Sequence, residues 1–173
     1  LDVFATVLPD DSLAGWNGYG LAVQAYQKRA QAVIDHVGAL ARHYGRHVKV
    51  RLVKGAYWDT EIKRAQEAGL EAYPLFTRKV STDVSYLACA KFMLGKRHLF
   101  YPQFATHNAH TIAAIKIMAG EQGGYEFQRL HGMGQALYEQ VVGKDKMNQP
   151  CRIYAPVGSH EDLLAYLVRR LLE

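Results

Sequence analysis

Short strand-like runs alternate with longer helix-like segments along this chain. The strand-like runs are rich in β-compatible residues and cover residues 20–26, 47–53, 101–106, 125–130 and 152–157. In the other segments apolar residues recur at intervals of three and four, which predicts amphipathic helices over 27–44, 60–67, 77–94, 108–119, 135–142 and 159–173. Strands that alternate with helices imply a parallel sheet with right-handed crossovers, so the sequence predicts an α/β fold.

Several of the predicted helices carry start and stop signals. Asp59 can cap the helix over 60–67 and Asn108 the helix over 108–119, because short polar side chains accept hydrogen bonds from the first backbone N–H groups of a helix. Glycines follow the predicted helices at Gly69, Gly95, Gly120 and Gly143. The stretch 144–150 is the one linker-like segment in the sequence.

An open doubly wound sheet and a β/α barrel both fit this alternation. No Gly-rich turn of the dinucleotide-binding type follows the first predicted strand, which favours the barrel. The chain has 173 residues, whereas a complete barrel typically has roughly 250. We therefore expect residues 1–173 to form an incomplete (β/α)8 TIM-barrel domain with about five β/α units, and its chemistry to lie at the C-terminal ends of the strands.

Composition narrows the classes of function. A chain that is 49% hydrophobic and 21% charged, with no apolar run of about 18 residues, is typical of a globular protein rather than a membrane-spanning one. The net charge of +5 is spread along the chain, so we expect this segment to bind no nucleic acid and to favour anionic ligands such as carboxylates or phosphates. Cys89 and Cys151 lack partner spacing, which favours reduced thiols and a cytoplasmic location.

The second predicted strand ends in cations, a glycine and aromatics, at Arg51, Lys54, Gly55, Tyr57 and Trp58. Strand alternation aims Arg51 and Val53 to the same side, into the barrel. A buried arginine needs an anionic or acceptor partner, and a glycine lets a ligand approach the backbone. The alternative interpretation is an internal salt bridge beside a turn glycine.

The third predicted strand ends in Thr106, His107 and Asn108, followed by His110. His107 is either a hydrogen-bond donor to a cofactor or a satisfied structural histidine. The spacing of His107 and His110 is a weak metal signal, because no carboxylate or Cys accompanies the pair and the strand-to-helix bend breaks the helical register. No nucleophile elbow, phosphate loop or paired Cys motif occurs, so hydrolytic and zinc chemistry are unsupported.

The predicted helix over 159–173 has a polar stripe beside its apolar face. Tyr166, Arg169 and Arg170 belong to this stripe. Adjacent arginines usually form a solvated face. With Tyr154 on the preceding strand they also resemble a pocket for a small carboxylate, since a guanidinium fork matches a carboxylate bidentately.

A series of long motifs resembles the proline dehydrogenase domain of the proline utilization A family. The motifs are R-L-V-K-G-A-Y-W-D at 51–59, Y-P-Q-F-A-T-H-N at 101–108, L-H-G-M-G at 130–134 and Y-L-V-R-R at 166–170. The resemblance runs from about Ala14 to the end of the chain. By the order of the motifs, the resemblance implies that this chain contains strands four to eight of the family's barrel.

The resemblance also implies an activity. It is the FAD-dependent oxidation of L-proline to Δ1-pyrroline-5-carboxylate, the first step of proline catabolism, with electrons passed to a membrane quinone. It implies a cytoplasmic parent protein with peripheral membrane association, and in this family a pyrroline-5-carboxylate dehydrogenase module can be fused to the barrel.

Carried over by motif, the resemblance implies a set of site residues. Arg51 would be catalytic, with its positive charge near the reactive flavin nitrogen favouring the anionic reduced ring. Arg169 and Arg170 would bind the proline carboxylate, and Tyr57, Leu130, Tyr154 and Tyr166 would shape the substrate pocket. No metal is implied. The FAD contacts would be Gln24, Arg51, Val53, Lys54, Gly55, Ala56, Trp58, Thr106, His107, Asn108, Gln128 and Leu130.

Three strands of the family's barrel have no counterpart in this sequence, which predicts an exposed sheet edge. The chain is then a fragment, one piece of a nicked protein, or a half that pairs with another copy of the chain. Either the missing N-terminal strands or that second copy would cover the edge. Whether the chain alone binds FAD or is active stays open. Two other functions also stay open: a barrel enzyme that binds a phosphorylated metabolite through Lys54, Arg169 and Arg170, and a non-catalytic assembly fragment.

Overall fold

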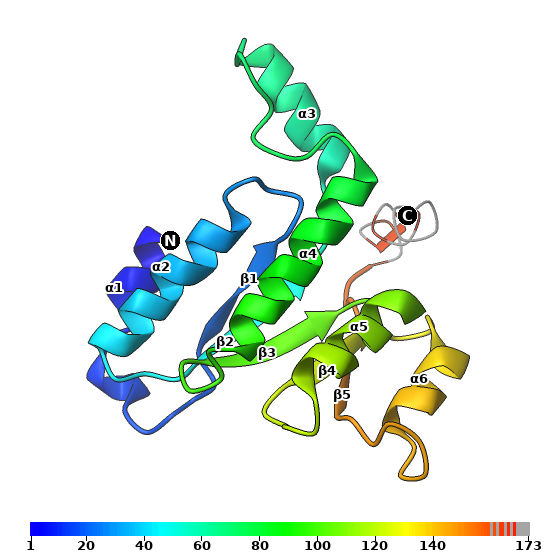
Figure 1. The fold of residues 1–173 in the computed structure, drawn as a ribbon. Helices are drawn as coiled ribbons and strands as arrows, with labels where there is room; N and C mark the ends of the chain where they lie inside the picture. The colour runs from blue at the N-terminus through cyan, green and yellow to red at the C-terminus, as the bar shows by residue number, and fades with distance from the viewer. Residues whose placement is uncertain (160, 162, 165, 167, 169–173) are drawn as a thin grey trace.

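A parallel sheet of five strands in the order β1-β2-β3-β4-β5 forms the centre of the computed structural model (Figure 1). The strands are β1 (Gly20–Gln24), β2 (Val48–Val53), β3 (Phe100–Ala105), β4 (Glu126–Leu130) and β5 (Cys151–Tyr154). The structure describes all residues except 160, 162, 165, 167 and 169–173. The sheet is not closed, as expected for an incomplete β/α barrel.

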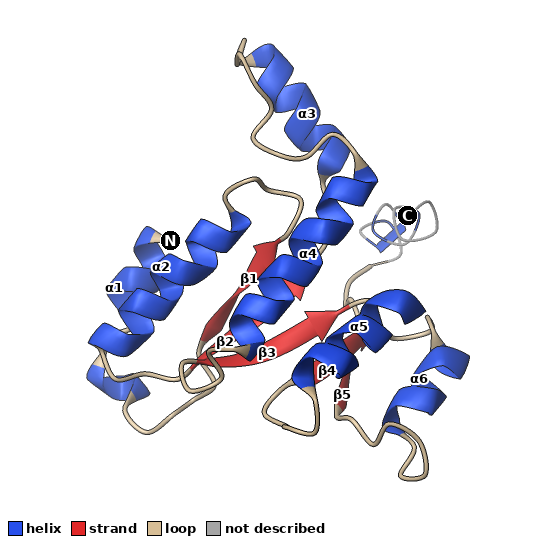
Figure 2. Ribbon diagram, in the orientation of Figure 1, coloured by secondary structure: helices blue, strands red, loops and turns tan. Residues whose placement is uncertain are grey.

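The helices are α1 (Asp2–Val7), α2 (Ala30–His43), α3 (Trp58–Glu67), α4 (Lys79–Leu94), α5 (Ala109–Ala119) and α6 (Gln135–Val142), with a short 3-10 turn at Asp11–Leu13. Figure 2 shows α2, α4 and α5 on the same side of the strands, and α3 extending away from the sheet. The face opposite these helices, called the inner face below, is the side that would line a barrel.

Burial alternates along the strands because successive side chains point to opposite faces. In β2 the side chains of Val48, Val50 and Leu52 are buried toward the helices, whereas Arg51 and Val53 are only partly buried. Arg51 and Val53 therefore share the inner face, as the sequence predicted. Buried side chains of α2, α4 and α5 complete the core, among them Ile34, Val37, Tyr86, Met93, Ile112 and Ile115.

The predicted order of elements is confirmed, but some boundaries were wrong. The helix α1 and the 3-10 turn were not predicted. Asn108 caps α5, since its side chain accepts a hydrogen bond from the backbone N–H of Thr111 at 2.9 Å. Asp59 does not cap α3: the cap is Tyr57, and Asp59 lies in the first turn, where its charge still stabilises the positive end of the helix. The fifth strand ends at Tyr154 rather than at 157.

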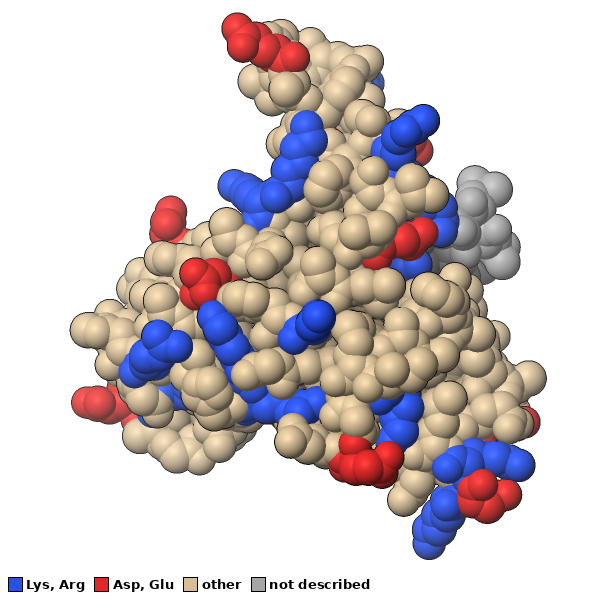
Figure 3. All heavy atoms as spheres, viewed as in Figure 1, with Lys and Arg blue, Asp and Glu red and all other residues tan. Residues whose placement is uncertain are grey.

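The predicted helix over 159–173 is described only in part. Glu161, Leu163, Leu164, Tyr166 and Val168 have helical backbone, whereas Arg169 and Arg170 lie outside the described residues. Among the helices of the described part of the chain, none is long and apolar enough to span a bilayer. On the face seen in Figure 3, basic side chains are scattered among acidic ones.

Candidate functional site

Parallel pairing brings the predicted site residues together at the C-terminal edge of the sheet. Gln24 at the end of β1 pairs in register with Val53 at the end of β2. Leu130 at the end of β4 pairs in the same way with Tyr154 at the end of β5. Because all the strands run in one direction, the residues that follow β2 and β3 leave the sheet at this same edge.

Arg51 is held on the inner face by an amide and an aromatic ring. Its Nε donates a hydrogen bond to Oε1 of Gln128 at 2.8 Å. Its guanidinium carbon lies 4.6 Å from the ring centroid of Tyr154, a distance suited to a cation–π contact. No carboxylate pairs with Arg51 in the described part of the chain, so the internal salt bridge considered from the sequence is wrong there.

At the level of Arg51 in the sheet, the buried carboxylate of Glu126 on β4 organises a polar network that the sequence did not reveal. Oε1 of Glu126 accepts hydrogen bonds from Nε2 of Gln103 at 2.7 Å and Nε2 of Gln128 at 2.9 Å. Arg152 binds both carboxylate oxygens, at 2.8 and 3.0 Å. Burial raises the pKa of Glu126, but the hydrogen bonds from Arg152, Gln128 and Gln103 outweigh it and lower the pKa below the ordinary value. The carboxylate is therefore charged at neutral pH.

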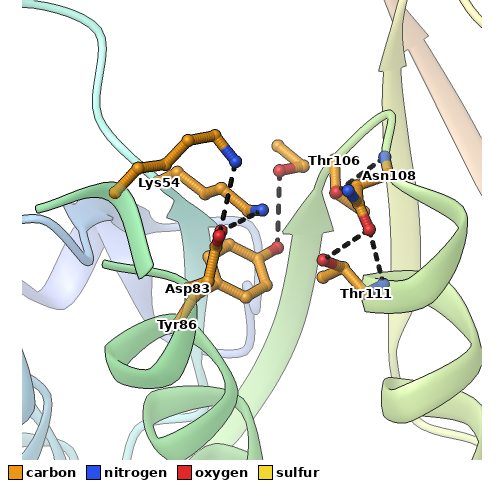
Figure 4. Close-up of polar contacts among 8 residues, drawn as sticks. Lys54, Asp83, Tyr86, Thr106, Asn108 and Thr111 are labelled. Atoms are coloured by element: carbon orange, nitrogen blue, oxygen red, sulfur yellow. Dashed lines mark hydrogen bonds and ion pairs between the residues drawn. The ribbon is translucent and has the colours of Figure 1, made fainter. Parts of the chain in front are cut away.

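Lys54 points toward helix α4 and forms an ion pair there (Figure 4). Its Nζ lies 2.5 Å from Oδ1 of Asp83, and Nζ of Lys79 lies 3.3 Å from the other oxygen. Burial raises the pKa of Asp83, but the Lys54 hydrogen bond and charge lower it below the ordinary value. Asp83 was not predicted from the sequence, because it lies in an ordinary helical stretch with no motif around it.

The turn after β3 is fixed by hydrogen bonds of its own residues. The backbone N–H of Asn108 donates to the Thr106 hydroxyl at 3.2 Å (Figure 4). The backbone N–H of Leu130 donates to Nε2 of His107 at 3.0 Å, so the proton of the neutral imidazole is on Nδ1. This bond supports the structural interpretation of His107, since the ring ties the end of β3 to the end of β4. A role of Nδ1 toward a cofactor stays a prediction.

The residues after β2 form a second turn at the site. The backbone N–H of Ala56 donates to Oε1 of Gln24 at 3.2 Å, and the Trp58 indole N–H donates to the Phe76 carbonyl at 3.0 Å. The residues Tyr57 and Trp58 are 48% and 43% exposed, so both are accessible at the edge of the sheet.

Gly55 is required by packing against an aromatic ring. It has a φ of +155°, and a Cβ at this position would lie 2.3 Å from the Tyr26 ring. We expected the glycine to admit a ligand. Tyr26 fills the space on the side where a Cβ would point, so a ligand could approach the Gly55 backbone only from another side, and that approach stays a prediction.

Three further predictions concern the last segment of the chain, the two cysteines and metal binding. Tyr166 is half-buried in the described part of the last segment, while Arg169 and Arg170, the expected carboxylate ligands, are outside it. Neither Cys89 nor Cys151 forms a disulfide. Within the described residues, no group of three or more His, Cys, Asp or Glu side chains could hold a metal ion.

Comparisons with known proteins agree with this geometry. A family model described as proline dehydrogenase matches residues 1–173. The chain is 64% identical over 179 residues to the bifunctional protein PutA of Escherichia coli (strain K12), an alignment that covers 100% of this chain and 14% of that protein. The chain thus spans about one seventh of the length of this curated relative.

Solved structures show the same likeness. A crystal structure of a variant of Bradyrhizobium japonicum proline utilization A superimposes with a TM-score of 0.93 and 66% identity, covering 99% of this chain and 18% of that one. The corresponding protein of Bdellovibrio bacteriovorus, inactivated by N-propargylglycine, gives a TM-score of 0.92 and 35% identity with the same coverage. These matches confirm both the incomplete barrel and the resemblance found in the motifs.

Proposed function

The chain belongs to the proline dehydrogenase family, and from this premise we propose that it takes part in the FAD-dependent oxidation of L-proline to Δ1-pyrroline-5-carboxylate. The proposal concerns the protein at its full natural length, because the chain spans 14% of the length of its PutA relatives. The observation that carries it is the position of Arg51, which is held over Tyr154 at the C-terminal edge of the sheet. The chemistry of β/α barrels lies at this edge.

The charges and donors at this edge fit a flavin dinucleotide. Nε is the only Arg51 atom that makes a hydrogen bond to a described residue, and in this proposal the terminal nitrogens of the guanidinium bind the cofactor. Lys54 and Lys79 together carry one positive charge more than their partner Asp83, which suits a diphosphate. The exposed indole of Trp58 adds a flat apolar surface.

FAD, when bound, accepts the electrons of the oxidation. In this proposal, the charge of Arg51 favours the electron-rich reduced ring, and Lys54 neutralises negative charge elsewhere on the cofactor. The ordered turns after β2 and β3 offer preformed backbone groups, because the side chains of Gln24 and Thr106 already hold these turns in place. The full set of proposed contacts is Gln24, Arg51, Val53, Lys54, Gly55, Ala56, Trp58, Thr106, His107, Asn108, Gln128 and Leu130.

For the substrate, we propose that Arg169 and Arg170 bind the carboxylate of L-proline while Tyr57, Leu130, Tyr154 and Tyr166 form the walls. The register pairing of Leu130 with Tyr154 supports this arrangement, since it joins two of the wall residues at one level of the sheet. Orientation of a small ring between a carboxylate clamp and apolar walls would supply much of the catalysis, and the oxidation needs no protein nucleophile.

The wider setting of the activity is also proposed. The electron acceptor is a membrane quinone, reached from a cytoplasmic protein that associates peripherally with the membrane. A fused pyrroline-5-carboxylate dehydrogenase module would use the product, in keeping with the name of the bifunctional relatives. The open edges at β1 and β5 would be covered by further barrel strands or by another copy of the chain. The alternative ligand, a phosphorylated metabolite bound through Lys54, Arg169 and Arg170, is less well supported, because the family model that matches the chain is that of proline dehydrogenase.

An absorption spectrum tests the proposed function. FAD is added to the purified protein, unbound flavin is removed, and L-proline is then added without oxygen. We expect flavin bands that stay with the protein and bleach with L-proline but not with D-proline. A protein of full natural length that retains no flavin, or whose flavin is not reduced by L-proline, would contradict the proposal. Repeating the measurement on residues 1–173 alone tests whether this segment binds flavin by itself.

A further inference from the structure

The inner face of this sheet is unusually polar. The interior of a β/α barrel is normally filled by branched apolar side chains. Here neighbouring strands carry polar side chains at matching levels: Arg51 pairs in register with Gln103, and Gln103 with Glu126. On the other side of β4, Gln128 pairs with Arg152. A polar row that replaces apolar packing needs a reason beyond stability, because buried polar groups rarely stabilise a fold more than well-packed apolar ones.

Glu126 is the centre of this row. Its side chain is 6% exposed, and it receives hydrogen bonds from Gln103, Gln128 and Arg152. All of these partners offer N–H groups, and an ionised carboxylate is the one side chain of this size that accepts at every position and donates at none. A glutamine at position 126 would present its own NH2 group to at least one of these donors.

The bond between Glu126 and Gln128 determines which end of the Gln128 amide faces Arg51. Because Nε2 of Gln128 donates to Glu126, Oε1 is turned the other way and accepts from Nε of Arg51. The reversed amide would place an NH2 group against the N–H of Arg51, and that bond would be lost. The guanidinium would then keep the Tyr154 ring as its remaining described contact.

We propose that Glu126 is a positioning residue for the cofactor-binding Arg51, and that it acts through the amide of Gln128. The inference rests on the proposed function in one respect, namely that Arg51 contacts the flavin. Glu126 itself contacts no ligand in this proposal. It fixes the direction of the Gln128 amide, which fixes the plane of the Arg51 guanidinium and aims its terminal nitrogens.

The test uses the protein at its full natural length and compares Glu126→Gln with the matched control Glu139→Gln. Glu139 is an exposed residue on α6, so the control removes the same charge away from the network. The readouts are the FAD dissociation constant, the midpoint potential of bound flavin and the KM for L-proline. We expect Glu126→Gln to weaken FAD binding about tenfold, the size of losing one hydrogen bond to a charged group. We also expect a more negative midpoint potential and an unchanged KM, while the control behaves as wild type.

A double-mutant cycle with Arg51→Lys separates positioning from general structural damage. Lysine keeps the charge but lacks the Nε–H that binds Gln128. If Glu126 acts through Arg51, adding Glu126→Gln to Arg51→Lys changes FAD affinity less than about twofold. Equal losses in both backgrounds would overturn the inference, as would wild-type affinity and potential in Glu126→Gln.

Two further outcomes are informative. Should Glu126→Gln fail to fold, Gln128→Met breaks the same link and leaves the Glu126–Arg152 ion pair, and wild-type FAD affinity and potential in this variant would overturn the inference. If wild-type protein binds no FAD, both the proposed function and the inference fail. If wild-type protein binds FAD and is reduced by L-proline while the variants are unaffected, the inference alone fails.

Discussion

The guanidinium of Arg51 lies 4.6 Å from the ring of Tyr154, although β3 and β4 separate their strands in the sheet. Adjacent strands are about 4.8 Å apart, so two positions three strands apart on a flat sheet would be about 14 Å apart. The long side chains of Arg51 and Tyr154 cover part of this distance, and curvature of the sheet toward its inner face shortens the remainder. The contact therefore records the coiling that would close a barrel.

The Arg51–Tyr154 contact gives a first prediction. Tyr154→Leu removes the ring face, and we expect FAD affinity to fall about three- to tenfold, the range of a partly desolvated cation–π contact. Tyr154→Phe keeps the ring and should stay within about twofold of wild type for FAD affinity. Titration of each variant with FAD measures the effect. Equal affinities for the leucine and phenylalanine variants would show that the ring face does not hold Arg51.

The packing of Gly55 against Tyr26 predicts a cost for any side chain at this position. Gly55→Ala would place a methyl group 2.3 Å from the ring at a φ of +155°, and we expect the free energy of unfolding to fall by about 1–3 kcal/mol. Gly123→Ala is the matched control, because its Cβ would meet no atom within 4 Å. Denaturant unfolding compares the two. A Gly55→Ala protein as stable as the control would contradict the close approach.

The cap of α5 predicts a local stability effect. Asn108→Ala removes the acceptor for the Thr111 backbone N–H and should lower the free energy of unfolding by about 1 kcal/mol. Asn108→Asp keeps the acceptor and places a negative charge at the positive end of the helix, so we expect stability close to wild type or above it. Thermal unfolding of both variants tests this, and equal losses would show that the side-chain oxygen of residue 108 is not the cap.

The lowered pKa of Glu126 predicts a pH dependence of stability. The folded-state pKa lies below the unfolded value of 4.5, so the carboxylate stabilises the folded state above that pH. This contribution is lost as the pH falls through the folded-state pKa. The difference in unfolding free energy between wild type and Glu126→Gln should be full near neutral pH and shrink below pH 4.5. Urea unfolding between pH 7 and pH 3 measures it, and a difference that grew on acidification would contradict the assignment.

The sequence predicted the local part of this structure well. Apolar spacing identified each strand and the helices between them, and it aimed Arg51 and Val53 at one face, because the periods of 2 and 3.6 are properties of the local chain. Boundaries were less well predicted. Asp59 has the right chemistry for a cap, but the helix begins one residue before it, at Trp58. The cap position is therefore Tyr57, whose backbone is not helical.

In the candidate site, too, some residues were named from the sequence and others were found only in the structure. The resemblance proposed Arg51, Lys54 and Gln128 as site residues, but it did not name Asp83, which pairs with Lys54, or Glu126, which binds Gln128. Asp83 and Glu126 lie in stretches with no motif, and each meets its partner only after the strands pair. The charges of Asp83 and Glu126 could have suggested that each forms an ion pair, but the sequence does not show which cation each one binds.

By itself, then, the sequence determined the α/β class, the order of the strands and the helices between them, the family motifs and the edge of the sheet at which the candidate site residues gather. The tertiary structure decided that Gln128 and Tyr154 hold Arg51, that Asp83 holds Lys54, and that Tyr26 fills the space beside Gly55. The physical reason is distance along the chain. Periodicity acts between residues a few positions apart, whereas these contacts join residues that only strand register and sheet curvature bring within a few ångströms.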